Sequence, residues 1–285
     1  MKILVTGAAG RIGKAVCRCL SEGGFDVKAT DLKFDRGLPV RVDVADVLDR
    51  EACYRLIEGV ETVVHLANHP GPSYSDAQKV FNENVAMNMN VFQAAAELGV
   101  SRIVFASSIQ AISGHRYYPE EEQAPSGLSY LPLDGDHPPN PGNTYALSKV
   151  VTETMLKYYV KIHGMRGVAI RFPSVLERKW LREIWERSAR ERRGYGPLDE
   201  GFSYLTFEDA AELVKAILLT PLDGFRVYQP AALSPCVDMP VREIVDRFYS
   251  NVPLRKPVAE LQGLVDVSTI TQETGWTPRD NMRTA

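Results

Sequence analysis

Three glycines near the start of the chain constrain its fold more than any other feature. They stand at positions 7, 10 and 13 in the segment GAAGRIG, which follows a β-branched run over residues 2–6 and leads into a helical pattern. Glycine permits a tight strand-to-helix turn and lets backbone N–H groups approach a ligand closely. Because the first N–H groups of a helix are unpaired and its N-terminal end is partly positive, such a turn suits a pyrophosphate.

A carboxylate at the end of the second expected strand narrows the ligand. Asp31 follows the run over residues 25–30 and can accept hydrogen bonds from the ribose of an adenosine. Its charge repels a ribose 2′-phosphate, so the sequence favours NAD, while Lys33 nearby keeps NADP open. Asp43, after the third expected strand, could contact the edge of the adenine ring. A turn or capping role is an equal alternative for this residue.

Strand and helix patterns alternate over the first 170 residues. β-branched runs fall near residues 2–6, 25–30, 39–42, 62–66, 102–107 and 166–171. Helical patterns stand between most of them, one with Asp46 as its N-cap candidate and one over about 78–98. The alternation predicts an α/β fold, a doubly wound parallel sheet of the Rossmann type.

The pattern changes in the second half of the chain. Residues 113–143 are rich in Pro, Gly, Tyr and acids and predict a long loop, and we then expect helices over about 179–193 and 207–219 and a strand at 225–228. We therefore divide the chain into a NAD-binding Rossmann domain at 1–172 and a small, interleaved C-terminal substrate lobe at 173–285.

Composition excludes several classes of protein. The net charge is −3, from 33 basic and 36 acidic residues, which offers no field for holding nucleic acid. The sequence has no apolar run of membrane-spanning length and no signal peptide in its first residues, so we expect a cytoplasmic protein that does not bind membranes. The four cysteines and five histidines show no metal-binding spacing, so we expect no metal.

A tyrosine and a lysine supply candidate acid/base chemistry. Tyr145 and Lys149 stand four residues apart at the start of an expected helix and so share one face. An ammonium and an oxidised nicotinamide ring would both favour the phenolate, and we expect them to lower the pKa of Tyr145 towards neutrality. Ser108 ends the fifth expected strand at the edge where ligands of such sheets bind, and it can hydrogen-bond both the phenol and a substrate hydroxyl.

These motifs, taken in order, resemble those of the extended short-chain dehydrogenase/reductase family, the NAD-dependent epimerase/dehydratases. The resemblance covers about residues 1–175 and is carried by the glycine turn, residues 65–68 (HLAN), Asn84 with Val85, Ser107 with Ser108, the Tyr145/Lys149 pair and residues 171–173 (RFP). Several further phrases are similar to the uronate dehydrogenase branch, among them residues 103–108, 117–119 (YYP) and 275–281.

The resemblance implies a role for each matching residue. Tyr145 would be the base, Lys149 would hold the phenolate and the nicotinamide ribose, Ser108 would orient the substrate, and Asn84 would support the helix and a proton path. The implied cofactor residues are Gly7, Gly10, Arg11, Ile12, Gly13, Asp31, Asp43, Val44, Leu66, Ala67, Asn68, Asn84, Ala106, Tyr145, Lys149, Phe172 and Pro173. The family also pairs two helices, here about 78–98 and 144–163, so we expect a homodimer.

The branches of this family differ in the step that comes after hydride removal from a sugar. Ile109 and Gln110 stand where dehydratases carry an acid pair, so dehydration is disfavoured; the same two residues replace an Asn-His pair of the uronate branch. We expect an NAD-dependent sugar dehydrogenase or epimerase. The alternatives are a nucleotide-sugar 4-epimerase and a non-catalytic NAD-binding sensor or scaffold, although such a binder would need only the glycine turn and Asp31.

Candidate substrate contacts come from two regions. His69 and His115 fall in expected active-site loops. Ser108, Ile109 and Gln110, at the end of the fifth expected strand, are candidates as well. In the charged stretch 177–193, Arg178 or Arg182 could clamp a carboxylate or phosphate. The alternative for that stretch is an amphipathic helix with a solvated charged face.

Overall fold

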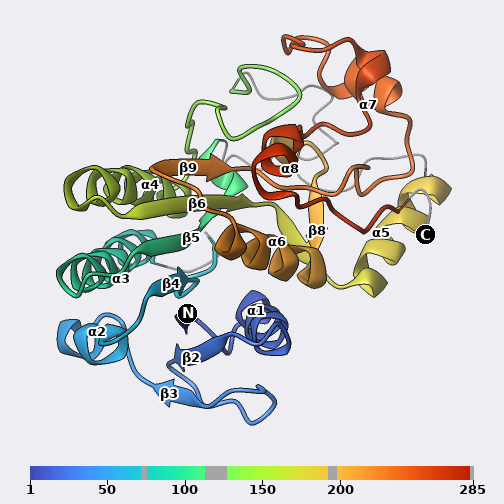
Figure 1. The fold of residues 1–285 in the computed structure, drawn as a ribbon. Helices are drawn as coiled ribbons and strands as arrows, with labels where there is room; N and C mark the ends of the chain where they lie inside the picture. Colours follow the sequence, from blue (N-terminus) through green and yellow to red (C-terminus); the bar gives the residue numbers. More distant parts are fainter. Residues whose placement is uncertain (72–75, 113–126, 192–197, 283–285) are drawn as a thin grey trace.

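The computed structural model describes residues 1–71, 76–112, 127–191 and 198–282. Its centre is a parallel sheet of seven strands in the order β3-β2-β1-β4-β5-β6-β9 (Figure 1). The strands are β1 (Lys2–Thr6), β2 (Asp26–Asp31), β3 (Val42–Val44), β4 (Thr62–His65), β5 (Arg102–Ser108), β6 (Arg166–Phe172) and β9 (Phe225–Tyr228). The chain leaves β1 in opposite directions for β2 and β4, so the predicted doubly wound fold is confirmed.

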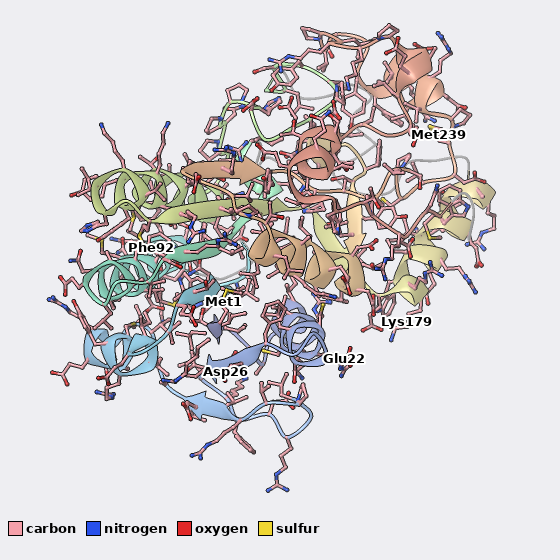
Figure 2. All side chains as sticks on the ribbon, in the orientation of Figure 1. Met1, Glu22, Asp26, Phe92, Lys179 and Met239 are labelled. Atoms are coloured by element: carbon pink, nitrogen blue, oxygen red, sulfur yellow. The ribbon has the colours of Figure 1, made fainter. Side chains whose placement is uncertain are left out.

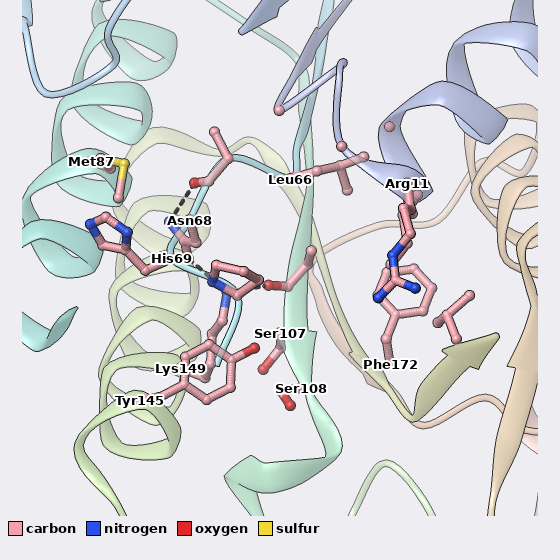
Figure 3. Close-up of a pocket in the computed structure, with 18 of the residues that line it drawn as sticks. Arg11, Leu66, Asn68, His69, Met87, Ser107, Ser108, Tyr145, Lys149 and Phe172 are labelled. Atoms are coloured by element: carbon pink, nitrogen blue, oxygen red, sulfur yellow. Dashed lines mark hydrogen bonds between the residues drawn. The ribbon is translucent and has the colours of Figure 1, made fainter. Parts of the chain in front are cut away.

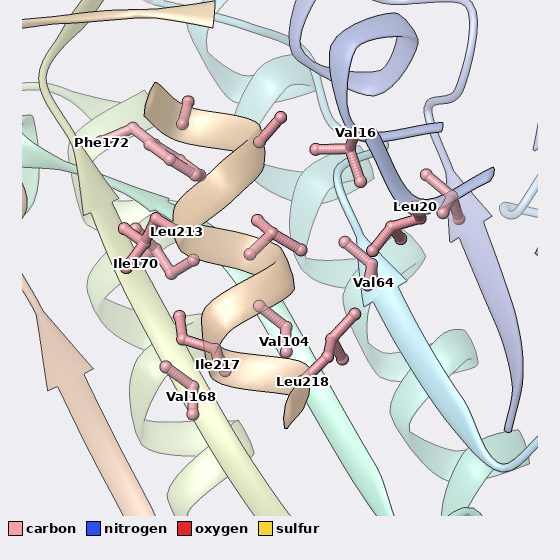
Figure 4. Packing of buried hydrophobic residues seen from close by; sticks show 14 of the residues in the cluster. Val16, Leu20, Val64, Val104, Val168, Ile170, Phe172, Leu213, Ile217 and Leu218 are labelled. Atoms are coloured by element: carbon pink, nitrogen blue, oxygen red, sulfur yellow. The ribbon is translucent and has the colours of Figure 1, made fainter. Parts of the chain in front are cut away.

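Helices cover both faces of this sheet. On one face lie α1 (Arg11–Glu22) and α6 (Phe207–Leu219), and on the other lie α2 (Arg50–Ile57), α3 (Ala77–Glu97) and α4 (Thr144–His163) (Figure 1). Figure 4 shows Leu213 and Ile217 of α6 lying over Val168 and Ile170 of β6. All four side chains are at most 1% exposed, and burial of each contributes about 1.5–3 kcal/mol.

The opposite face has its own apolar cluster. Phe92 of α3 is fully buried there, with its ring edge-on to Phe105 of β5 at 6.0 Å between centroids. Figure 2 shows Phe92 beside the sheet, whereas Lys179 extends from the outer edge of the molecule. In the parts of the chain that the structure describes, no helix is long and apolar enough to cross a membrane.

A smaller lobe lies beyond the carboxyl ends of the strands. It contains a two-stranded sheet of β7 (Ser174–Leu176) and β8 (Tyr204–Thr206), with α5 (Arg178–Glu191), α7 (Val241–Phe248) and α8 (Ser268–Thr274). The described residues also contain three short 3-10 helices: η1 (Ile109–Ala111), η2 (Leu198–Glu200) and η3 (Val258–Glu260). Buried aromatic side chains, including Phe202, Tyr204 and Phe248, hold the lobe together around its own apolar cluster.

Three features differ from the sequence-based expectations. The third strand is Val42–Val44 rather than 39–42. The N-cap of α2 is Asp49 rather than Asp46, and the Asp49 carboxylate accepts hydrogen bonds from the N–H groups of Glu51 and Ala52. The strand at 225–228 pairs with β6 in the central sheet instead of lying in the lobe. The lobe is therefore interleaved with the sheet domain, since the chain returns to the sheet through α6 and β9.

Candidate active site

A cavity of about 580 Å³ opens along the carboxyl ends of the strands. It extends from the glycine turn and the end of β2 to the ends of β5 and β6 and the start of α4 (Figure 3). Leu176 and Glu200 of the lobe also line it. A cavity of this volume at the point where the strand order reverses is the usual ligand site of an open α/β sheet.

The glycine turn is packed too closely for side chains. Gly7 has φ +66°, and a Cβ there would stand 2.8 Å from the backbone N of Ala67. A Cβ on Gly13 would stand 2.2 Å from the carbonyl oxygen of Gly7. The turn thus brings the N-terminus of α1 directly against the cavity, which Gly7, Gly10 and Gly13 line. This arrangement fits a pyrophosphate held by backbone N–H groups.

Asp31 is oriented by the backbone around it. One carboxylate oxygen accepts from the N–H of Ala9 at 3.0 Å and the other from the N–H of Lys33 at 3.2 Å. The side chain lines the cavity at the end of β2, so its remaining lone pairs can accept hydrogen bonds from ribose hydroxyls. The residues present therefore fit the adenosine half of NAD.

Tyr145 and Lys149 are placed by the first turns of α4. The helix begins after Asn143, whose side chain accepts from the N–H of Ala146 at 2.8 Å. Both residues line the cavity, with the ammonium of Lys149 5.5 Å from the Tyr145 ring centroid, and Figure 3 shows them facing Ser108 at the end of β5. The expected convergence of these three side chains on one cavity is what the structure shows.

Burial controls the proton affinity of this pair. Tyr145 is 8% exposed, and desolvation raises the pKa of its phenol to about 12, although a hydrogen bond with Ser108 lowers the pKa. Desolvation lowers the pKa of Lys149 to about 7, while the carboxylate of Glu153 raises it. The expected fall in the Tyr145 pKa requires both the Lys149 ammonium and an oxidised nicotinamide ring; in the chain alone the pKa is raised, because loss of water outweighs the hydrogen bond with Ser108.

The ammonium of Lys149 forms hydrogen bonds with the loop after β4 and with β5. It donates to Oδ1 of Asn68 at 2.7 Å and to the carbonyl of Ala106 at 2.8 Å. The side-chain amide of Asn68 in turn donates a hydrogen bond to Oδ1 of Asn88 at 2.9 Å. The same Oδ1 is hydrogen-bonded to Nε2 of the buried His65 ring at 2.8 Å. Burial lowers the pKa of His65 to about 3, so this histidine is neutral and serves as a fixed hydrogen-bonding group.

A buried ion pair lies next to Lys149 in the structure, between α4 and β6. Arg171 of β6 donates to both carboxylate oxygens of Glu153, at 3.0 and 2.9 Å, and to the carbonyl of His137 at 2.8 Å. The same carboxylate accepts from Ser107 at 2.6 Å. Because Glu153 stands one turn beyond Lys149 on α4, this network joins that helix to the ends of β5 and β6.

Most of the sequence-predicted site residues line the cavity. They are Gly7, Gly10, Arg11, Ile12, Gly13, Asp31, Leu66, Ala67, Asn68, His69, Ala106, Ser108, Ile109, Gln110, Tyr145, Lys149, Phe172 and Pro173. His115 and residues 117–119 lie outside the described residues.

Five candidates are not among the described residues that line the cavity. Val44 is 60% exposed. The backbone carbonyl of Asp43 accepts a hydrogen bond from the Thr30 hydroxyl. Asn84 is buried, and its side-chain oxygen accepts a hydrogen bond from the N–H of His69 at 2.8 Å. Arg178 is paired with Asp280 at 2.6 Å, and Arg182 is exposed on α5. Asn84 thus supports the loop that carries His69, and α5 has the solvated charged face of the alternative interpretation.

Sequence reasoning missed several lining residues. Phe207, at the start of α6, lies in the cavity wall with the guanidinium of Arg11 5.7 Å from its ring centroid. Glu200 reaches the cavity from η2 and is 3% exposed. Neither stands in a motif, and both come from segments more than 180 residues after the glycine turn. Only the fold brings them to the site.

Comparison with known proteins finds relatives of this chain. Residues 3–179 match the profile of the NAD dependent epimerase/dehydratase family. A NAD-dependent glucose-6-phosphate dehydrogenase of Haloferax volcanii is 32% identical over 61% of this chain and 69% of its own length. An L-arabinose 1-dehydrogenase (NAD(P)(+)) of the same organism is 27% identical over 99% of this chain and 98% of its own length.

Solved structures share the fold. Uronate dehydrogenase from Agrobacterium tumefaciens superposes with a TM-score of 0.68 at 22% identity, covering 99% of this chain and 86% of that one. A UDP-glucose 4-epimerase from Thermotoga maritima gives a TM-score of 0.72 at 19% identity, covering 99% and 95%. With a profile match over more than half of its length and the glycine turn, Asp31 and the Ser108, Tyr145 and Lys149 set gathered at one cavity, this chain belongs to the NAD-dependent epimerase/dehydratase family.

Proposed function

We propose that this protein is an NAD-dependent dehydrogenase of a sugar, which oxidises a hydroxyl-bearing carbon held beside Tyr145. The observation that carries the proposal is the convergence of Ser108, Tyr145 and Lys149 on the cavity that also holds the glycine turn and Asp31. A protein that only bound the nucleotide would need the turn and Asp31 but would not need a phenol, a hydroxyl and an ammonium at the other end.

The chain's own residues would handle the proton. Ser108 donates a hydrogen bond to the substrate oxygen and fixes it against Tyr145, and the phenolate takes the hydroxyl proton as the carbonyl forms. NAD⁺, when bound, supplies the acceptor for the hydride that leaves the same carbon, and a positive ring charge near the phenol. Lys149 adds a second positive charge when it is protonated. Burial lowers the pKa of its ammonium to about 7, and the carboxylate of Glu153 opposes a further fall.

The choice of dehydrogenase within the family rests on two further observations. Ile109 and Gln110 line the cavity next to Ser108, and neither can act as the acid or base of an elimination. One relative of matching length is an arabinose dehydrogenase, and two more relatives are glucose-6-phosphate and uronate dehydrogenases. Epimerases of nucleotide sugars also match, so an epimerase remains the second candidate.

We also propose a homodimer formed through α3 and α4, and a division of labour in which the lobe after residue 172 holds the sugar. Met89 of α3 and Ile162 of α4 are 47% and 55% exposed, and these two helices pack against each other. Exposed apolar side chains on a helix pair favour association. Small-angle scattering should return about twice the chain mass. The proposed location is the cytoplasm, where NAD is available.

The decisive experiment measures NADH formation over a panel of free sugars with NAD⁺. Once a substrate is found, Tyr145→Phe should lower kcat by about 10²–10⁴-fold, because the phenol is the proton acceptor. Tyr158→Phe, on an exposed position of the same helix, is the matched control and should keep full activity. Full turnover by Tyr145→Phe, or tight NADH binding with no turnover of any sugar, would overturn the proposal.

A further inference from the structure

A buried carboxylate stands at the sugar end of the cavity. Glu200 ends η2, is 3% exposed and lines the cavity together with Ser174, whose hydroxyl donates to Oε2 of Glu200 at 3.5 Å. Tyr145 lines the same cavity, and the charge of Glu200 raises the pKa of its phenol. Glu200 and the phenol therefore face one cavity.

The other carboxylates of the described cavity wall lie at its opposite end. Asp31 ends β2 and Asp46 follows β3, and both strands are on the far side of β1 from β5 and β6. That end fits the adenosine. Glu200, in contrast, is next to the segment that follows β6, because Ser174 pairs in register with Tyr204 just beyond η2.

We propose that Glu200 is a specificity-determining residue that accepts hydrogen bonds from a hydroxyl of the sugar, and that the substrate is an uncharged sugar rather than a sugar acid. The proposal rests on the proposed dehydrogenase function and names its substrate class. Ser174 completes the contact, because a hydroxyl can donate to the sugar or accept from it.

The charge of the site supports this choice. A carboxylate in a poorly solvated pocket is a strong acceptor for hydroxyl groups, and hydrogen bonds to a charged partner are the strong ones. A sugar acid would bring a second carboxylate to the same buried place, and two such groups resist being ionised together. The ammonium of Lys149 already donates to Asn68 and Ala106.

The test uses sugar pairs that differ only at C6, D-galactose with D-galacturonate and D-glucose with D-glucuronate. For the wild-type protein we expect kcat/KM for the neutral member of a pair to exceed that for the acid by at least about tenfold, which corresponds to about 1.4 kcal/mol. Glu200→Gln keeps the shape and removes the charge, so it should lower kcat/KM for the neutral sugar and shift the ratio towards the acid by about tenfold. Glu183→Gln, an exposed change on α5, is the matched control and should leave both values unchanged.

Binding gives a second readout that needs no turnover. In the presence of NADH, the neutral sugar should raise the Tm of the wild-type protein more than the acid does, and Glu200→Gln should reduce that difference. A preference for the acid in the wild-type protein, or an unchanged preference in Glu200→Gln, would overturn the proposal. Failure of the dehydrogenase function alone would appear as a binding preference without NADH formation.

Discussion

The buried pair of Glu153 and Arg171 makes the sharpest prediction about stability. The two side chains are 7% and 3% exposed and share two hydrogen bonds, so neither charge is solvated by water. Removing one partner of a buried pair typically destabilises a protein by about 3–5 kcal/mol, because the other charge is left uncompensated. We expect Glu153→Gln to fall in that range. Unfolding entropy of about 2.1 cal/mol/K per residue gives about 0.6 kcal/mol/K for this chain, so the Tm should drop by about 5–8 °C.

Thermal and urea unfolding of single and double variants would check this prediction. The double variant Glu153→Met with Arg171→Met removes both charges. It should be more stable than the single variants Glu153→Met and Arg171→Met. Glu153→Gln should also lower the pKa of Lys149 further, since it removes the charge that raises it. A Tm drop below about 2 °C for both single variants, with a double variant no better than either, would show that the pair contributes little and that our reasoning is wrong.

Two other residues carry independent predictions. Asp31→Asn should reduce the ratio of kcat/KM with NAD to that with NADP by at least about tenfold, because the charge that repels a 2′-phosphate is lost; an unchanged ratio measured with both cofactors would contradict this. Burial lowers the pKa of Lys149 from 10.5 to about 7, so between these pH values the unfolded chain binds one more proton than the folded chain, and the folded state gains stability as pH rises. Lys149→Met removes this gain, so its Tm relative to the wild-type protein should fall steadily from about pH 7 to about pH 10 in calorimetry, and a difference that does not change with pH would refute the assignment.

The parts of the fold with a local physical cause could be predicted from the sequence. The glycine turn has to be glycine because Cβ atoms at positions 7 and 13 would meet backbone. The helix at Phe207–Leu219 and the strand at Phe225–Tyr228 were expected with the observed bounds, since their apolar period is clear. Asp46 and Asp49 both suit an N-cap, and only the geometry of the chain selects Asp49.

The parts that depend on burial and on distant segments could not be predicted. The pKa of Tyr145 is raised because the lobe and the sheet remove water from the phenol, and a sequence does not report desolvation. Glu200 and Phe207 reach the cavity only because the chain folds back from the lobe. The strand at 225–228 was misplaced for the same reason, since the pattern of one strand does not tell which sheet it joins.

The return of the chain to the sheet through α6 and β9 means that the protein cannot be divided by one cut. A chain ending at Phe172 would lose Leu213 and Ile217, the apolar cover of Val168 and Ile170, and would leave β6 as a bare edge strand. Exposed edges and apolar faces of this kind promote aggregation. The sheet domain therefore depends on residues that are synthesised after the first segment of the lobe, and release of a nascent chain before Tyr228 would yield a species without a closed core.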